Sequence, residues 1–460
     1  MSGRVAVAGA GIAGLTAAHR LTRRAPDLEV TVLESQAAPG GKIRSARVGG
    51  VMLEAGPDSL LARKPAGVEL CRELGLGDDL VAPGAGVAQI WTDAGLLRFP
   101  SGPFGISTDL GELWRWEGMS RRGKLRAAGD LVRRARTDPS DESLGSLIRR
   151  RMGDEAAEKL VAPLLGGLFA GDVDRLSVLA TFPELARWER ERGSLIRGAR
   201  AAARAARGPR VAPMFLRLRG GLIRLVEALG AELGPRLRCG VEVTGLSLEG
   251  DRYWVATSEG DLEADAVILA TPAFVTADLV EPLAPAAAPE LRAIPHVSTC
   301  VVLFVYEQGT GPALPESSGF VSPRGALAIS AATLVSRKWP DRSFGDRAVI
   351  RCFVGGVGTE ELVEAPDEDL VEGVCRQLQA IYRLPERAAA AAVVRWPRAM
   401  PQYEVGHLER VDRIERALPP RVALVGQGYR GTGIPDCIRG GDEAATRVAS
   451  LLEVEGERVR

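Results

Sequence analysis

Val7-Ala8-Gly9-Ala10-Gly11-Ile12-Ala13-Gly14 is the stretch that decides the fold. It follows a predicted strand that begins near residue 4, and it opens a predicted helix over residues 12–23. The first glycine permits a tight turn, the second lets the backbone approach a pyrophosphate, and the third allows close packing of the helix on the strand. The positive end of the helix then points at the phosphates. The pattern predicts a dinucleotide site at Gly9, Ala10, Gly11, Ile12, Ala13 and Gly14.

The next strand, residues 29–33, ends in Glu34. A carboxylate there suits ribose hydroxyls and repels a ribose phosphate, so the acid favours FAD or NAD over NADP. Ser35 follows it, and Pro39-Gly40-Gly41-Lys42 comes shortly after. The amide of Gly41 and the cation of Lys42 suit a second phosphate or a ribityl chain. The alternative for this tetrapeptide is an ordinary surface turn.

Two later stretches have the same character. Gly56, Pro57, Asp58 and Ser59 form a strand end that runs into a stiff turn, which we expect to aim its amides and Ser59 at a flavin edge. Near the C-terminus, Thr432, Gly433 and Ile434 follow a glycine-rich turn and precede a helix predicted to begin near Asp436. A helix N-terminus beside a flavin favours the reduced anion, because its partial charge is positive.

Length and composition agree with a protein of two or three domains. The 460 residues include 59 basic and 59 acidic side chains, so bulk charge does not indicate a nucleic-acid partner. The six cysteines show no CxxC or Cys/His spacing, which indicates reduced, mostly buried thiols in a cytosolic protein and no metal site. No signal peptide is recognisable, and no apolar run approaches the roughly 18 residues of a spanning helix. We therefore expect a cytoplasmic protein.

The nucleotide-binding domain is predicted to assemble from separated segments. Besides the N-terminal unit, residues 220–271 show a helix at 222–233, a strand at 238–246, a hairpin strand at 253–257 and a buried strand at 266–270. Residues 421–452 supply a further strand, a turn and a helix. Residues 109–210 are helical in pattern, and residues 296–404 mix apolar strands with a helix near 367–382.

These motifs together resemble the FAD-dependent porphyrinogen oxidases, which are part of the flavin amine oxidase superfamily. The stretches that carry the resemblance are GAGIAGLTAA, GGK and GPDSLLARK near the start, GGLFAGDVDRLSVLATFPEL (166–185), RGGLIRLVEAL (219–229), RWPRAMPQYEVGHLERV (395–411) and GYRGTGIPDCIRGG (428–441). They cover nearly the whole chain. Amine oxidases and carotene desaturases share the motifs at the ends of the chain. The 166–185, 395–411 and 428–441 blocks are more specific to the porphyrinogen oxidases.

The resemblance implies an α/β fold with a Rossmann-like FAD-binding domain built from residues 1–60, 211–290 and 405–460. A mixed α+β substrate domain would use residues 61–90 and 291–404, and an inserted helical domain residues 91–210. The implied reaction is a six-electron aromatisation of a porphyrinogen, in three two-electron turns each closed by O2 with release of H2O2. The resemblance adds Val243 and Trp396 to the cofactor contacts. No residue is assigned to catalysis, and His19, His296 and His407 are taken as structural.

The substrate of such an enzyme carries propionates, which need cations at the rim of an apolar slot. Arg63 and Lys64 are the predicted propionate contacts, with a solvated helix start as the alternative. Gly167 and Gly171 are expected either to approach a pyrrole edge or to serve packing alone. GPDSLLARK resembles the coproporphyrinogen-oxidising branch of the family, which implies the tetra-acid coproporphyrinogen III over protoporphyrinogen IX, and the 166–185 block is similar to both branches. A flavin amine oxidase, a polyene desaturase and a non-catalytic porphyrin carrier stay open as rivals.

Two basic stretches bear on partners. Residues 115–136 contain eight Arg or Lys against two acids, and residues 187–210 contain eight Arg against two acids. Such stretches suit an anionic lipid surface at the inner face of a membrane, an anionic substrate, or a downstream ferrochelatase. The alternative is that they are solvated faces of helices.

Overall fold

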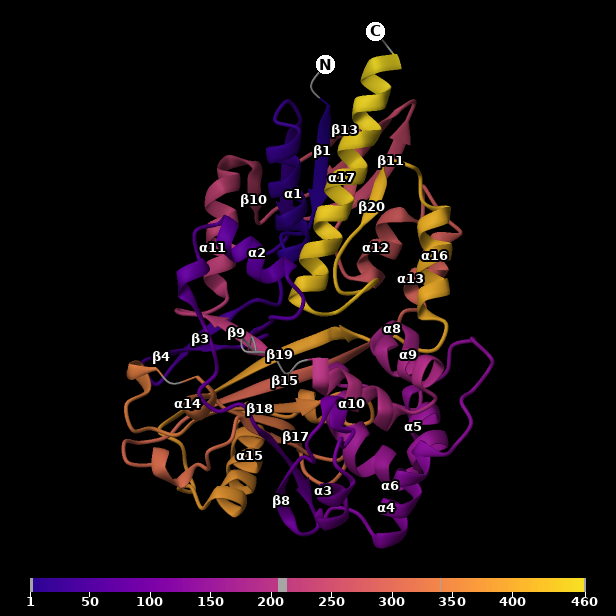
Figure 1. The fold of residues 1–460 in the computed structure, drawn as a ribbon. Coiled ribbons are helices and arrows are strands. Elements are labelled where there is room, and N and C mark those ends of the chain that lie inside the picture. Colours follow the sequence, from indigo (N-terminus) through magenta and orange to yellow (C-terminus); the bar gives the residue numbers. More distant parts are fainter. Residues whose placement is uncertain (1–2, 206–212, 340, 459–460) are drawn as a thin grey trace.

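The computed structural model describes residues 3–205, 213–339 and 341–458. The N- and C-terminal segments lie together in a part built around a parallel sheet, and a second sheet and a group of helices lie side by side beneath it (Figure 1). The last part of the second basic stretch, residues 206–210, falls outside the described residues.

The sheet that carries the glycine-rich turn has five strands, all parallel, in the order β10-β2-β1-β14-β20. Its inner strands are almost entirely buried, as expected where helices cover both faces of a parallel sheet. The strands are β10 (Leu237–Cys239), β2 (Glu29–Glu34), β1 (Arg4–Ala8), β14 (Ala266–Leu269) and β20 (Val422–Leu424).

One face of this sheet is covered by α1 (Ile12–Arg24), α11 (Ile223–Leu233), α2 (Ala66–Glu73) and α17 (Ile434–Arg458). The helix α17 lies along α1 (Figure 1), and the two approach so closely that a Cβ on Gly441 would sit 2.5 Å from the Ala13 carbonyl oxygen. Segments from both ends of the chain and from its middle therefore share one core, which confirms the prediction of a discontinuous nucleotide-binding unit.

The other face is covered by α12 (Ala273–Val280), α13 (Ala287–Arg292), α16 (His407–Ala417) and a three-stranded antiparallel sheet. That sheet consists of β11 (Val243–Glu249), β12 (Arg252–Thr257) and β13 (Leu262–Ala264). The single strand predicted at 238–246 is wrong. It is two strands in two sheets, divided at Gly240, whose φ of 78° turns the chain.

The second large sheet has seven strands in the order β19-β15-β18-β17-β16-β7-β8. Against one face packs α15 (Asp367–Tyr382), and against the other the hairpin of β3 (Ser45–Val48) and β4 (Val51–Glu54). The strands are β19 (Ala390–Pro401), β15 (His296–Val305), β18 (Val349–Gly355), β17 (Ile329–Leu334), β16 (Gly319–Val321), β7 (Ala88–Thr92) and β8 (Gly95–Arg98). The short helix α14 (Val335–Lys338) follows β17.

The hairpin β7–β8 crosses residue 91, where we expected the helical domain to begin, so that boundary would cut one sheet. Likewise β5 (Leu60–Leu61) pairs with β9 (Phe215–Leu218), which also pairs with β6 (Leu80–Val81), and α2 packs into the nucleotide-binding core. Residues 61–81 therefore pack with the parallel sheet, and the division into domains stays a proposal with these corrected boundaries.

The helical unit has its own core of buried side chains between residues 106 and 199. Its helices are α3 (Leu110–Arg115), α4 (Arg121–Ala128), α5 (Leu144–Met152), α6 (Asp154–Ala156), a π-helix (Ala157–Gly166), α7 (Gly167–Phe169), α8 (Val178–Thr181), α9 (Pro183–Arg192) and α10 (Leu195–Ala205). In the described part of the chain, no helix is both long enough and apolar enough to cross a bilayer.

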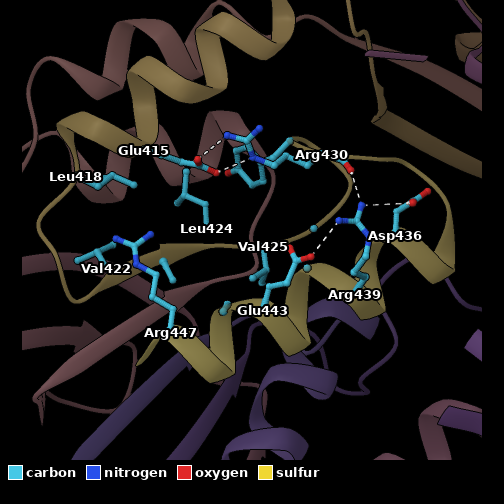
Figure 2. Close-up of a pocket in the computed structure, with 15 residues that line it drawn as sticks. Glu415, Leu418, Val422, Leu424, Val425, Arg430, Asp436, Arg439, Glu443 and Arg447 are labelled. Carbon is cyan, nitrogen blue, oxygen red and sulfur yellow. Dashed lines mark hydrogen bonds and ion pairs between the residues drawn. The ribbon is translucent and has the colours of Figure 1, made fainter. Parts of the chain in front are cut away.

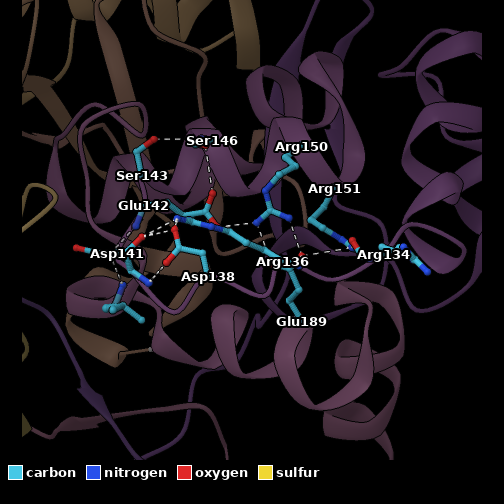
Figure 3. Close-up of polar contacts among 12 residues, drawn as sticks. Arg134, Arg136, Asp138, Asp141, Glu142, Ser143, Ser146, Arg150, Arg151 and Glu189 are labelled. Atoms are coloured by element: carbon cyan, nitrogen blue, oxygen red, sulfur yellow. Dashed lines mark hydrogen bonds and ion pairs between the residues drawn. The ribbon is translucent and has the colours of Figure 1, made fainter.

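A polar network holds these helices together (Figure 3). Arg151 is fully buried, its Nε lies 2.6 Å from Asp130, and its guanidinium also donates to the carbonyl oxygens of Arg134 and Gly193. Arg150 pairs with Glu189 at 2.6 Å. The acids Asp130 and Glu189 of the two basic stretches are thus paired with arginines of α5, which lies between the stretches. Arg126 of the first stretch donates to the Arg149 carbonyl near the end of α5.

Candidate functional site

The site is built around the first turn of α1. Gly9 has a φ of 101°, and its amide donates to the Leu33 carbonyl at 2.7 Å, which closes the turn between β1 and the helix. A Cβ on Gly14 would lie 2.0 Å from the Gly9 carbonyl oxygen, so this position requires glycine. A Cβ on Gly11 would meet nothing within 4 Å. The helix has no side-chain cap, so its first-turn amides face open space and suit an anionic group.

Glu34 lies beside this turn and is buried. One carboxylate oxygen accepts from the Ala10 amide at 2.7 Å and the other from the Gln36 amide at 2.9 Å. The Gly40 amide donates to the Ala10 carbonyl at 2.8 Å, and a Cβ on Gly41 would be 3.3 Å from the Gly11 Cα. The predicted acid and the predicted second glycine turn therefore border the same open space as the helix.

Lys42 extends this cradle. The surrounding protein lowers its pKa to about 8, because burial penalises the ammonium. Ser35 stays beside Glu34, its hydroxyl 3.4 Å from a carboxylate oxygen. The chain returns to this region at residues 240–243, where the Gly240 amide donates to Gln36 and the Val241 amide to Glu34. Val243, which the family resemblance places at the adenine, begins β11 directly after these contacts.

The turn at residues 56–59 differs from the expectation. The Asp58 carboxylate turns inward, where Lys338 Nζ and Trp339 Nε1 lie 2.9 and 3.0 Å from Oδ2, and the Ser59 hydroxyl donates to Asp58 at 2.8 Å. The cations hold the pKa of Asp58 well below its usual range, against the opposing effect of burial. The side chains of Asp58 and Ser59 therefore already have protein partners and do not face a flavin. The backbone of this turn remains available for contact with a flavin.

The C-terminal glycine turn leads directly into α17, which begins at Ile434, two residues before the predicted start. Gly431 has a φ of 133°, and a Cβ there would lie 2.5 Å from the Cβ of Asp436. Trp396, on β19, donates through Nε1 to the Ala55 carbonyl at 2.9 Å. This tryptophan therefore lies against the 56–59 turn.

Of the predicted substrate contacts, the two cations have different surroundings. Lys64 Nζ lies 2.8 and 2.7 Å from the two carboxylate oxygens of Asp436, so it already has an anionic partner. The Arg63 guanidinium lies over the Phe104 ring at 5.5 Å, and no carboxylate of the described residues pairs with it. Arg63 is therefore the cation that is free to bind an anion.

The two glycines predicted to contact substrate, Gly167 and Gly171, differ in their surroundings. A Cβ on Gly167 would meet nothing within 4 Å, whereas one on Gly171 would lie 2.4 Å from Gln402 Oε1. The Gly171 carbonyl also accepts from Arg324 at 3.1 Å. Gly171 is thus a packing position, and Gly167 borders open space.

The three histidines share a depressed pKa. Burial lowers the pKa of His296 and of His407 to about 4, and it also lowers that of His19. The lowered pKa values favour the neutral form of all three rings at neutral pH.

Sequence reasoning missed the partners of Asp58. Arg351 is buried in β18, 3.5 Å from Asp58, and donates to the Gly56 carbonyl. A lone arginine inside the apolar stretch 348–354 was the available signal, since buried arginines are paired. Lys338 and Trp339 gave no comparable signal.

A surface groove lies elsewhere, between α16, β20 and the outer side of α17 (Figure 2). Its polar side chains neutralise one another, since Arg430 pairs with Glu415 at 2.6 Å and Arg439 with Glu443 at 3.1 Å. No predicted cofactor or substrate residue lines it. This groove is therefore distinct from the cradle at α1.

Comparison with known proteins agrees with the cradle. A family model described as flavin containing amine oxidoreductase matches residues 12–449, and the chain belongs to this family. It is 33% identical to the coproporphyrinogen III oxidase of Bacillus subtilis over 97% of this chain and 98% of that one. It is 29% identical to a chloroplastic protoporphyrinogen oxidase of Oryza sativa over 97% of this chain and 88% of the relative.

Solved structures show the same fold. A proposed protoporphyrinogen oxidase from Exiguobacterium sp. 255-15 matches with a TM-score of 0.88 and 33% identity, over 97% of this chain and 99% of the other. A putrescine oxidase bound to putrescine matches with a TM-score of 0.72 at 18% identity, over 98% and 99% of the two chains. The predicted flavoprotein fold and the predicted family are confirmed, and a flavin is the cofactor that the family implies.

Proposed function

We propose that this chain binds FAD and uses O2 to oxidise coproporphyrinogen III to coproporphyrin III in haem biosynthesis. The observation that carries the proposal is the 33% identity, over nearly the full length of both chains, to a coproporphyrinogen III oxidase. The uncapped first turn of α1 and the acid Glu34 beside it support a dinucleotide. A bound flavin supplies the two-electron chemistry with substrate and with O2.

The chain's own residues bind and orient. The amides from Gly11 to Gly14 would hold the pyrophosphate, Glu34 the ribose, and Lys42 a phosphate or the ribityl chain. The amides of the 56–59 turn and of residues 432–434 would border the isoalloxazine, with Trp396 beside them. These assignments place no acid or base at the reacting carbon.

The substrate assignment rests on charge. Coproporphyrinogen III carries four propionates and protoporphyrinogen IX carries two, so the tetra-acid gains more from a free cation. Arg63 has no carboxylate partner among the described residues and is proposed as a propionate contact. Lys64 would contribute only if a propionate displaced Asp436. Gly167, which borders open space, is proposed to lie near a pyrrole edge.

Protoporphyrinogen IX is the second candidate substrate, favoured by the rice relative and by the Exiguobacterium structure. The test offers both porphyrinogens separately to the purified protein under air and follows porphyrin fluorescence and H2O2. A higher kcat/KM for the tetra-acid supports the proposal. Preference for the di-acid reverses the substrate assignment, and turnover of neither indicates another flavin oxidase or a carrier.

Contact with a ferrochelatase and peripheral contact with a membrane are further parts of the proposal. Trp114, Leu125 and Val132 are exposed in the helical unit, where Lys124 joins α3 to α4 by donating to the Trp114 carbonyl. Arg121 and Arg122 begin α4 beside them. Apolar and basic side chains together suit an anionic lipid surface. Sedimentation with anionic vesicles tests this contact.

A further inference from the structure

The loop between β20 and α17 is held by hydrogen bonds to residues outside it. Gln427 donates through Nε2 to the Ala399 carbonyl at 2.5 Å, and the Tyr429 hydroxyl donates to Thr276 at 3.2 Å. The Tyr429 ring is buried. The loop then runs through Gly431 into residues 432–434, the predicted flavin neighbours. Its shape therefore decides how the first amides of α17 are presented.

Tyr403 closes this loop. Its hydroxyl donates to the Gln427 carbonyl at 2.6 Å and accepts from the Gly431 amide at 2.9 Å, so one oxygen atom joins the two ends of a five-residue segment. The Tyr403 side chain is 1% exposed, and the two loop residues that it joins are half-buried. Removing the hydroxyl leaves the Gln427 carbonyl and the Gly431 amide without this partner.

His407 supports the same loop from beneath. Its ring stacks on Tyr403 with centroids 3.9 Å apart and planes 14° from parallel, and it is fully buried. Nε2 lies 2.8 Å from the Tyr429 carbonyl. Since a carbonyl only accepts, Nε2 carries the proton and donates. The stacked pair thus fixes three successive points of the loop, at Gln427, Tyr429 and Gly431.

The main chain of Tyr403 is anchored independently of its hydroxyl. The Ser177 amide donates to the Tyr403 carbonyl at 2.8 Å, and the neighbouring Gln402 donates to the Phe169 carbonyl at 2.9 Å. The Tyr403 ring also contacts the Phe169 ring. Loss of the hydroxyl alone would therefore leave the ring in place and release the loop.

We propose that Tyr403 is a positioning residue that, through its hydroxyl and the loop it closes, fixes the N-terminus of α17 against the flavin and so raises the flavin's reduction potential. The inference rests on the proposed function, because it requires a bound flavin. Its physical basis is that a helix N-terminus stabilises negative charge within its first turn, and reduction places negative charge on the flavin. A loosened loop weakens that interaction for the reduced form more than for the oxidised form.

The test compares Tyr403→Phe with Tyr382→Phe. Tyr382 is a matched control, because its buried hydroxyl has no hydrogen-bond partner among the described residues and lies in the core of the other sheet. The readouts are the FAD dissociation constant, the visible spectrum and the midpoint potential of the bound flavin, all measured without porphyrinogen. In Tyr403→Phe we expect the ratio of the affinity for reduced flavin to that for oxidised flavin to fall at least tenfold. This fall lowers the midpoint potential by about 30 mV for a two-electron couple. Tyr382→Phe should leave the potential unchanged.

A second pair keeps the inference testable if Tyr403→Phe does not fold. His407→Leu removes the donor to the Tyr429 carbonyl and should lower the flavin's midpoint potential. His407→Gln retains an amide donor and should keep the potential close to that of the wild type. An unchanged potential in Tyr403→Phe, or in a folded His407→Leu, overturns the positioning role while leaving flavin binding intact. A wild-type protein that binds no flavin overturns the proposed function as well as this inference.

Discussion

Substitutions at Gly11 and Gly14 separate the binding of a cofactor from the packing of the fold. Gly11 has a φ of −69° and a ψ of 171°, which alanine adopts without strain, and its Cβ would meet nothing within 4 Å. The cost of losing a glycine N-cap and the gain from a stiffer unfolded chain offset one another, so the free energy of unfolding should change by about 1 kcal/mol or less. At Gly14 the Cβ would lie 2.0 Å from the Gly9 carbonyl oxygen. Because that neighbour is backbone, Gly14→Ala should cost about 3 kcal/mol.

Gly11→Ala, which should change the free energy of unfolding little, should weaken the binding of FAD strongly. The new methyl group occupies the space that the pyrophosphate requires, so at least one hydrogen bond between an amide and a charged oxygen is lost. Such a bond contributes about 1.5–3 kcal/mol, which corresponds to roughly a 10- to 150-fold weaker FAD affinity.

The assay uses deflavinated protein. Urea unfolding gives the stability of wild type, Gly11→Ala and Gly14→Ala, and quenching of FAD fluorescence gives the dissociation constant. We expect Gly11→Ala to be as stable as wild type and to bind FAD poorly. FAD binding by Gly11→Ala at wild-type affinity would show that the first turn of α1 is not the pyrophosphate site and would refute the reasoning.

Three further predictions concern charge. Lys42 is proposed to contact a phosphate or the ribityl chain of FAD, and burial lowers its pKa to about 8. A phosphate contact requires the protonated ammonium, so FAD should bind most tightly below that pH, and its affinity should fall above it by up to about tenfold per pH unit. Titrations of Lys42→Met should show weaker binding that does not change with pH. Arg351→Met should destabilise the protein by about 3 kcal/mol, measured by urea unfolding. This value is at the low end for a broken buried ion pair, because Asp58 keeps its pair with Lys338. The exposed control Arg376→Met should change the free energy of unfolding by about 0.5 kcal/mol or less. Arg63→Met should raise KM for coproporphyrinogen III about tenfold, the loss of one charge-assisted bond, with a smaller effect on the di-acid; equal effects on both substrates would exclude a tetra-acid-specific contact.

The nucleotide-binding core was predictable because its signals are local. A strand, three glycines at fixed spacing, a helix and an acid occur within 34 residues, and each follows from backbone geometry. The strand at 238–246 was mispredicted because an apolar run was given more weight than Gly240, although an isolated glycine inside a strand pattern indicates a bend. The hairpin β7–β8 was cut because its parallel partner β16 lies more than 200 residues later in the chain.

The backbone turns of the candidate site could be predicted from the sequence, whereas the partners of its charged side chains could not. Lys338 lies 280 residues from Asp58 and Asp436 lies 372 residues from Lys64, and a single sequence holds no information on such pairs. Lys64 was therefore predicted to contact substrate, and Asp58 cofactor, although each pairs with a distant residue of the chain. The first basic stretch shows the same effect, since Arg126 donates to carbonyls at the end of α5.

The most direct test of the central claim is anaerobic mixing of the FAD-loaded protein with limiting coproporphyrinogen III, followed by flavin absorbance and porphyrin fluorescence. The account predicts that the yellow colour is lost, that three flavins are reduced for each coproporphyrin formed, and that air restores the colour with release of H2O2. Binding of coproporphyrinogen III without loss of the flavin colour would contradict the account and identify a carrier. Loss of colour with protoporphyrinogen IX alone would contradict the choice of substrate.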